Sequence, residues 1–181
     1  MSDTAVLVID VQQGLCSGQY ACPDPAGLIE RINIVTAKAR AAGAPVVLIQ
    51  HEDDGLLAHG GAAWQLAEGL AAEPADIRLR KTATDSFHRT DLRERLQQMG
   101  VGQLVICGLQ SEFCVDTTTR SAMRLGYPVT LVADGHSTID NGLLTAEQIS
   151  RHHGLTLSNI ESFGPRTTLV AARDVAFPVK G

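Results

Sequence analysis

The sequence lacks the features that mark proteins that bind nucleic acids, proteins that bind or span membranes, and secreted proteins. Its 181 residues include 15 lysines and arginines against 20 aspartates and glutamates, which gives a net charge of -5 at pH 7. The basic residues are scattered, so no basic patch indicates a nucleic-acid or acidic-membrane partner. No apolar run approaches the ~20 residues that span a bilayer, and no secretory signal is recognisable at the start. We therefore expect no nucleic-acid partner, no membrane partner and a cytoplasmic location.

Several motifs are missing as well. The four cysteines, Cys16, Cys22, Cys107 and Cys114, show neither C-x-x-C nor Cys/His zinc spacing, which predicts reduced thiols. No G-x-G-x-x-G follows the first apolar run and no G-x-x-x-x-G-K-[ST] occurs, so a nucleotide-binding loop is not indicated. No internal repeat, low-complexity tract or linker divides the chain. Together with the length, this predicts a single domain over residues 1–181.

What the sequence does contain is an alternation of strand-length apolar runs and helical patterns. Strands are expected at residues 4–11, 45–50, 76–81, 103–109, 127–134 and 167–172. Strands separated by helices imply right-handed crossovers and a parallel sheet with helices on both faces. The predicted fold is therefore α/β, a three-layer α/β/α domain with a six-stranded parallel sheet and Rossmann-like winding.

Capping residues and glycines mark the expected helix boundaries. Asp24 is expected to cap a helix that has Pro25 at its first position and stops at Gly43. Two more helices are expected from Thr90 to Gly100 and, through a capping box of Thr145 and Gln148, to Gly154. His152 and His153 then fall at a helix end, where they favour the dipole. A short helix is expected around Trp64 and Leu66.

Three residues whose side chains can take part in catalysis occur at or near the carboxyl ends of predicted strands, where α/β sheets bind ligands. They are Asp10, Lys81 and Cys114, the last in the first turn of a helix that follows Gly108. A helix N-terminus and a nearby lysine stabilise a thiolate, and a carboxylate can take the thiol proton and return it to a leaving amine. The first amides of the helix can hold an oxyanion. Together these groups predict acyl transfer through a thioester.

Each of the three residues also has a structural interpretation when taken alone. Free cysteine is among the most buried residue types, and Cys107, inside an apolar strand, is interpreted as packing. Asp10 alone fits a loop cap, and Lys81 alone fits the solvated end of a polar strand. Only their joint placement favours the functional interpretation.

Four stretches, in order along the chain, carry a resemblance to a known family. They are VLVIDVQ (6–12), RKTATDSF (80–87), CGLQSEFCVDTTTR (107–120) and GYPVTLVADGHST (126–138). The chain resembles the isochorismatase-like cysteine hydrolases, which include nicotinamidases and N-carbamoylsarcosine amidohydrolase. The resemblance implies the isochorismatase-like hydrolase fold and a homo-oligomer, either dimer or tetramer, for which the last helix and the C-terminal tail are candidate contacts.

The resemblance also implies roles for individual residues. Cys114 is expected to be the nucleophile and Asp10 the general base, with Lys81 stabilising their ionised forms. A cis peptide is expected between Leu109 and Gln110. The backbone N–H groups of Gln110 and Cys114 are then expected to form the oxyanion hole.

Two departures from the family narrow the expected activity. Isochorismatases that cleave a vinyl ether usually lack a cysteine at this position, so Cys114 indicates an amide, ureide or related C–N substrate. Nicotinamidases usually carry an Asp-x-His metal site after the second strand, where this chain has IQHEDDGLLAHG. The possible ligands in that segment are His51, Glu52, Asp53, Asp54 and His59. A solvated acidic loop is the preferred interpretation, and we predict neither a metal nor any other cofactor.

The expected substrate is a small molecule. Its pocket is expected to be lined by Gln12, His51, Trp64, Phe87 and His136. Trp64 and Phe87 also fit a core, and His136 also fits an exposed turn. The leading hypothesis is a metal-independent cysteine hydrolase that opens a C–N bond and releases ammonia or an amine. The alternative is a non-catalytic small-molecule-binding or thiol redox-sensing protein, which needs the thiol but neither the aspartate nor the lysine.

Overall fold

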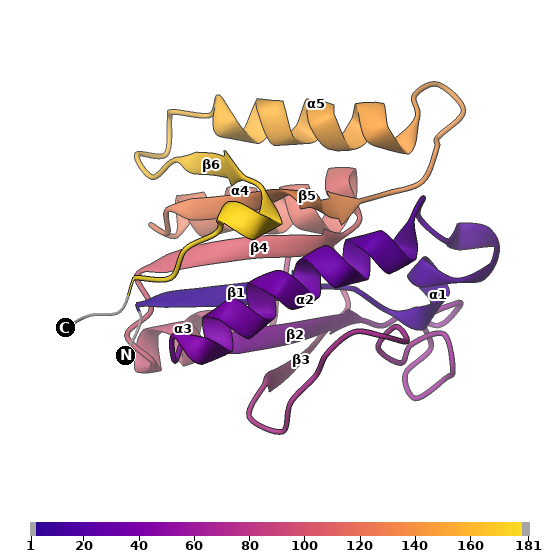
Figure 1. Cartoon of the computed structure of the whole chain (residues 1–181), viewed down its shortest axis with the longest axis horizontal. Coiled ribbons are helices and arrows are strands. Elements are labelled where there is room, and N and C mark those ends of the chain that lie inside the picture. Colours follow the sequence, from indigo (N-terminus) through magenta and orange to yellow (C-terminus); the bar gives the residue numbers. More distant parts are fainter. Residues whose placement is uncertain (1–2, 179–181) are drawn as a thin grey trace.

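The structure, a computed structural model, describes residues 3–178 and is built on one sheet of six parallel strands (Figure 1). The strands are β1 (Thr4–Ile9), β2 (Val46–His51), β3 (Ile77–Lys81), β4 (Gln103–Leu109), β5 (Val129–Ser137) and β6 (Thr167–Val170). Their order across the sheet is β3-β2-β1-β4-β5-β6, and every neighbouring pair is parallel. The winding therefore reverses between β1 and β4, and the predicted six-stranded α/β fold is confirmed.

Helices cover both faces of this sheet (Figure 1). The α-helices are α1 (Gln13–Cys16), α2 (Pro25–Ala41), α3 (Leu92–Gln98), α4 (Asp116–Arg124) and α5 (Ala146–Ser158). Shorter turns are η1 (Gly18–Tyr20), the π-helical η2 (Ser111–Val115) and η3 (Ala172–Asp174). None of the helices within residues 3–178 combines the length and the apolar character that crossing a bilayer requires.

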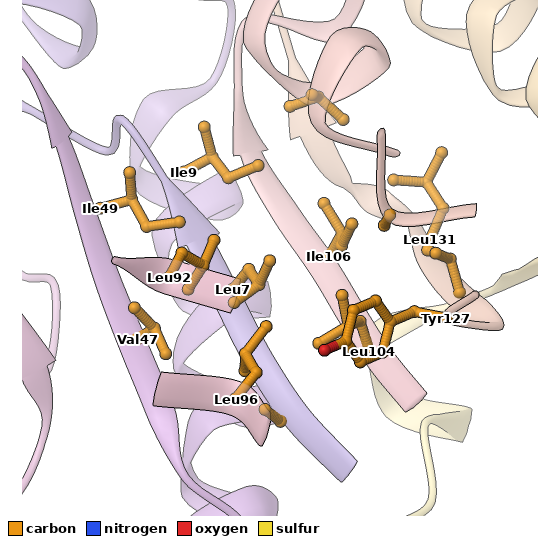
Figure 2. Packing of buried hydrophobic residues seen from close by; sticks show 14 of the residues in the cluster. Leu7, Ile9, Val47, Ile49, Leu92, Leu96, Leu104, Ile106, Tyr127 and Leu131 are labelled. Carbon is orange, nitrogen blue, oxygen red and sulfur yellow. The ribbon is translucent and has the colours of Figure 1, made fainter. Parts of the chain in front are cut away.

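Alternate residues along the strands point to opposite faces of the sheet and belong to two separate hydrophobic cores. Leu7 and Ile9 of β1 belong to a buried cluster with Leu92 of α3 and residues of α4 and α5 (Figure 2). Val6 and Val8 belong to a second cluster with residues of α2 and η3. All six residues of β1 are buried, as expected for a strand covered on both faces. The polar pattern of β3 fits its place at the sheet edge.

The predicted helix starts are confirmed where a capping side chain marks them. The Asp24 carboxylate accepts a hydrogen bond from the Gly27 N–H at 3.1 Å, and α2 begins at Pro25. Thr145 and Gln148 form both hydrogen bonds of a capping box at the start of α5.

The predicted end of α5 at Gly154 is wrong, because the helix continues to Ser158. Gly154 is buried, and a Cβ there would approach Leu169 of β6 at 3.4 Å and the ring of His136 at 3.8 Å. The glycine thus allows close packing of α5 on the sheet and does not end the helix. His152 and His153 therefore lie one turn inside the helix, and their assignment to its dipole is also wrong.

The short helix predicted around Trp64 and Leu66 is absent. Leu66 instead forms an isolated antiparallel bridge with Gln12, and the Ala67 N–H donates to the Val11 carbonyl at 3.0 Å. Pairing with the segment that follows β1 satisfies the backbone groups, so tertiary contacts override the helical propensity of this alanine-rich stretch.

Strand β5 is longer than predicted and reaches Ser137. The extension pairs His136 with Gly108 of β4, after a register shift between Ile106 and Gly108. His136 is consequently buried in the sheet, and the interpretation that places it in an exposed turn is wrong.

Candidate active site

Asp10, Lys81 and Cys114 meet at the carboxyl edge of the sheet, beside the point where the winding reverses. Asp10 follows β1 directly, Lys81 is the last residue of β3, and Cys114 lies in the π-helical turn that follows β4. Their positions follow from topology, since the apolar runs of parallel strands end at one edge and the next residues face the same crevice.

The seam between β1 and β4 is unusually tight. Gly108 pairs with Ile9 across the two strands and has a φ of +117. A Cβ at this position would collide with the Ile9 carbonyl oxygen. Glycine is therefore required here on two grounds, a backbone angle that side chains rarely adopt and a lack of space. Asp10, next to Ile9, also has a positive φ of 51, which aspartate tolerates better than most residues.

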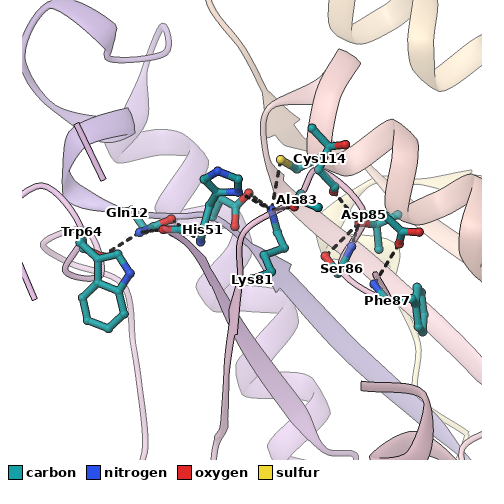
Figure 3. A network of polar contacts seen from close by, with 12 residues as sticks. Gln12, His51, Trp64, Lys81, Ala83, Asp85, Ser86, Phe87 and Cys114 are labelled. Atoms are coloured by element: carbon teal, nitrogen blue, oxygen red, sulfur yellow. Dashed lines mark hydrogen bonds and ion pairs between the residues drawn. The ribbon is translucent and has the colours of Figure 1, made fainter. Parts of the chain in front are cut away.

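The Lys81 ammonium contacts both of the other side chains, and its contact with Cys114 can be followed in Figure 3. Its Nζ lies 2.8 Å from Asp10 Oδ2 and 3.2 Å from Cys114 Sγ. All three residues are buried, with exposed fractions of 1% for Asp10, 2% for Lys81 and 8% for Cys114. The carboxylate and the ammonium form a buried ion pair whose hydrogen-bond geometry compensates for the loss of water.

Asp10 has one carboxylate oxygen to spare. Oδ2 accepts from Lys81, whereas Oδ1 is buried and takes part in no hydrogen bond among the described residues. A carboxylate oxygen with no donor is a costly buried group that a thiol proton can satisfy. Asp10 is therefore arranged to accept a proton.

The Cys114 thiol is protonated in the resting site. Burial raises the pKa of the Cys114 thiol to about 12, the negative charge of Asp10 adds to the rise, and Lys81 opposes it. Lys81 acts in the direction expected from the sequence and lowers the pKa of the thiol, but burial has the larger effect.

The chain around the nucleophile is irregular. The peptide bond between Leu109 and Gln110 is cis. The Val115 N–H and the Phe113 N–H both donate to the Gln110 carbonyl at 3.1 Å, and the first bond gives the turn its π-helical character. Cys114 thus lies in a wider turn than the regular helix start predicted from the sequence.

Gln12 is completely buried and serves the backbone of β2. Its Oε1 accepts from the His51 N–H at 2.9 Å, and its Nε2 donates to the carbonyls of His51 and Trp64, both at 2.9 Å. The side chain thereby continues the pairing between β1 and β2 where β1 has ended. Gln12 therefore holds the backbone of His51, and its expected place in the substrate pocket stays a prediction.

Of the other expected pocket residues, only His51 reaches the triad. Its Nδ1 lies 3.2 Å from Lys81 Nζ. Phe87 stacks on Tyr127 with 6.3 Å between ring centroids and packs against the core, so it lies apart from Cys114 (Figure 3). Trp64 packs edge-on against His59. His136 faces α5 and binds Ser111 Oγ through Nδ1 at 2.8 Å.

The acidic loop after β2 uses its carboxylates internally. Glu52 forms an ion pair with Arg80 at 2.7 Å, and Asp53 accepts from the N–H groups of Gly55 and Leu57. Among the described residues, the group whose side chains lie close enough to hold a metal is Asp10, His51 and Cys114, with ligand atoms within 4.8 Å of one another. The Lys81 ammonium already contacts all three, and its positive charge opposes a cation there.

A doubly wound sheet with a buried Asp–Lys–Cys set at its switch point defines an α/β domain with the layout of a cysteine hydrolase. The Isochorismatase domain model matches residues 4–157, and the chain belongs to the isochorismatase family.

Curated relatives and solved structures agree with this assignment. A streptothricin hydrolase of Streptomyces noursei is 38% identical over 138 residues, which cover 75% of this chain and 50% of that protein. The ureidoacrylate amidohydrolase RutB of Methylobacterium radiotolerans is 30% identical, with 97% of this chain and 80% of that protein covered. A crystal structure of an isochorismatase family protein has a TM-score of 0.86 at 37% identity and covers 94% of this chain and 99% of its own. The chain spans about half the length of the streptothricin hydrolases that it matches.

Proposed function

We propose that this chain is a metal-independent cysteine hydrolase that cleaves a C–N bond of a small amide or ureide through a covalent thioester. One observation carries the proposal: Lys81 Nζ contacts both Asp10 Oδ2 and Cys114 Sγ, while Asp10 Oδ1 has no other hydrogen bond among the described residues. A relative named ureidoacrylate amidohydrolase supports a C–N substrate. The low exposure of Cys114 supports a small one.

In the acylation step, Cys114 Sγ attacks the substrate carbonyl carbon and the thiol proton passes to Asp10 Oδ1. The oxyanion that forms is held by the backbone N–H groups of Gln110 and Cys114. The C–N bond then breaks, Asp10 gives the proton to the departing nitrogen, and ammonia or an amine leaves. The acyl group remains on sulfur as a thioester.

In the deacylation step, water attacks the thioester carbonyl and gives a proton to Asp10. The C–S bond breaks, the proton passes to Cys114 Sγ, and the carboxylic or carbamic acid leaves. Lys81 keeps its positive charge throughout, which offsets the negative charge as it moves between Asp10 and the sulfur. One proton acceptor thus serves both halves of the cycle.

The test is intact-mass analysis after brief incubation with a mixed panel of amides and ureides and an acid quench, with ammonia release measured in parallel. We expect an acyl adduct or ammonia release with the wild type and neither with Cys114→Ala. Cys107→Ala is the matched control, since it removes a fully buried thiol from β4 that lies outside the site. Turnover by Cys114→Ala equal to that of Cys107→Ala would refute the mechanism.

The redox-sensing alternative is disfavoured by the same geometry. A sensor thiol needs exposure and a depressed pKa, whereas burial raises the pKa of Cys114. Reversible oxidation of Cys114 under mild peroxide, with no hydrolysis over the panel, would favour the sensor instead.

We also propose that the chain self-associates through the surface around α5. The support for this is that Leu143, Leu155 and Phe163, three large apolar side chains on and next to this helix, are exposed. The end of the C-terminal tail, residues 179–181, lies outside the described residues. Light scattering that gives the mass of a single chain would refute this proposal.

A further inference from the structure

The Lys81 ammonium has more acceptors around it than protons to give. It carries three N–H bonds. Its Nζ lies 2.8 Å from Asp10 Oδ2, 3.0 Å from the Ala83 carbonyl, and 3.2 Å from both His51 Nδ1 and Cys114 Sγ. The two shorter contacts, to oxygen, take two of the protons. His51 and Cys114 therefore compete for the third.

His51 is placed for this competition by the sheet. It is the register partner of Lys81 across β2 and β3, so the two side chains emerge side by side from neighbouring strands (Figure 3). Gln12 fixes the backbone of His51 with two hydrogen bonds of 2.9 Å. His51 itself is half-buried. Its Nδ1 lies 3.2 Å from the Lys81 ammonium, and the Ala83 carbonyl lies close enough to the ring to favour the protonated form.

An acceptor role requires neutral imidazole with its proton on Nε2. Burial lowers the pKa of His51 below its ordinary value, and the positive charge of Lys81 lowers it further. The carboxylates of Asp10, just after β1, and of Asp53, in the loop after β2, oppose these effects, and so does the Ala83 carbonyl. Glu52, from the same loop, is occupied by Arg80. The net direction keeps His51 neutral at neutral pH, as the geometry requires.

We propose that His51 is a positioning residue that holds the third N–H of Lys81 whenever the Cys114 sulfur carries no charge. In the resting thiol and in the thioester, sulfur is a weak acceptor and the proton points at His51 Nδ1. When thiolate character develops as the thioester breaks, the proton turns to sulfur and stabilises the leaving group. The catalytic part of this inference rests on the proposed hydrolase function, whereas the hydrogen bond between Lys81 and His51 does not.

Nitrogen NMR tests the hydrogen bond without any substrate. The chain has 6 histidines, and the His51 signals are those lost in His51→Asn. We expect Nε2 protonated, Nδ1 bare, and a midpoint below the ordinary histidine value; Lys81→Met should raise that midpoint by removing the positive charge. A proton on Nδ1, or an unchanged midpoint in Lys81→Met, would overturn the proposal even if the enzyme is an active hydrolase.

Two substitutions separate positioning from structure and from substrate contact. His51→Asn keeps an oxygen near the Nδ1 position that accepts a hydrogen bond and does not titrate, whereas His51→Leu keeps only volume. We expect His51→Leu to lose roughly 10- to 100-fold in kcat with little change in KM, the usual effect of leaving a buried charged donor without its acceptor. His51→Asn should recover most of that loss and remove the acidic limb that His51 contributes to the pH profile.

The kinetic outcomes that overturn the proposal are equally specific. Equal activity of the Asn and Leu variants would show that the acceptor is irrelevant, and a change confined to KM would make His51 a substrate contact. His153→Asn is the matched control, because it alters a partly buried histidine that binds Asp116 away from the triad. If the wild type hydrolyses nothing, the proposed function fails, and the NMR measurement still decides the hydrogen bond.

Discussion

Two buried polar clusters lie at the carboxyl edge of this sheet, and they differ in how completely their hydrogen bonds are satisfied. In the first, Lys81 is surrounded by four acceptors while Asp10 Oδ1 has no donor among the described residues. In the second, beneath α5, Ser111 Oγ lies 2.8 Å from both His136 Nδ1 and Ser150 Oγ. The first cluster is charged and contains a proton acceptor that has no donor. The second is neutral, and both of its serine hydroxyls have a hydrogen-bond partner.

This difference helps to separate buried polar residues with a catalytic role from those with a structural role. A satisfied network holds its elements in one arrangement and gains nothing from a proton transfer. Ser111 accordingly ties the π-helical turn to β5 and α5. In the proposed mechanism, the Asp10 oxygen that has no donor receives the thiol proton. The following predictions change one cluster at a time.

The largest expected effect comes from Asp10→Asn. Asparagine tolerates the positive φ of this position, so the backbone is preserved while the proton acceptor is lost. General-base catalysis contributes typically 10²–10⁴-fold, and we expect a loss of roughly 10³-fold in the acylation rate. Single-turnover kinetics with a chromogenic amide measure it. A loss below about tenfold would show that another group takes the thiol proton.

Lys81→Met is expected to affect stability more than any single change in the second cluster. It leaves the Asp10 carboxylate buried without its counter-charge, at a cost of about 3–5 kcal/mol in the free energy of unfolding. Urea denaturation of the single variant and of the double variant with Asp10→Asn measures the coupling. The double variant should be the more stable of the two. A double variant less stable than Lys81→Met would contradict the ion-pair account.

The smallest expected effect is a pH dependence that arises in the second cluster. Burial lowers the pKa of His136 from 6.5 to about 4, the neighbouring His153 lowers it further, and Asp134 opposes the change. The unfolded chain therefore binds a proton that the folded protein does not. Stability should fall as the pH drops from 6.5 toward 4, by at most roughly 1.4 kcal/mol per unit from this residue.

His136→Asn provides the comparison for this pH dependence, because asparagine keeps a hydrogen-bonding group toward Ser111 and does not titrate. The difference in unfolding free energy between the two proteins, followed by denaturation from pH 7 to pH 4.5, should shrink as the pH falls. A constant difference would mean that His136 does not titrate between the two states.

The sequence was sufficient to predict the sheet and the meeting of Asp10, Lys81 and Cys114. Apolar runs fix the strand ends, and the topology of parallel sheets brings those ends together. The environment of each group was not predictable in the same way. Gln12 reaches His51 across 39 residues, and the burial of Cys114 depends on the width of the turn that carries it. Such contacts depend on side-chain packing between distant segments, which neither periodicity nor spacing encodes.

The errors have a common origin as well. Backbone freedom predicts a helix end at Gly154, whereas this glycine leaves room for Leu169 and His136. Helix propensity predicts a helix in the alanine-rich stretch around Trp64, whereas its backbone pairs with the segment after β1. The contact between His51 and Lys81 did have a signal, because both residues end neighbouring strands.

The tight seam at Gly108 has a consequence for changing what this protein acts on. Any side chain at that position would push β4 away from Ile9 and so separate Asp10 from Cys114. The spacing of β1 and β4 therefore does not tolerate a substitution at Gly108. Changes of substrate preference therefore have to come from the surrounding loops, above all residues 52–75. A library that randomises those loops and leaves Gly108 and Ile9 unchanged would vary selectivity while keeping Asp10 and Cys114 in place.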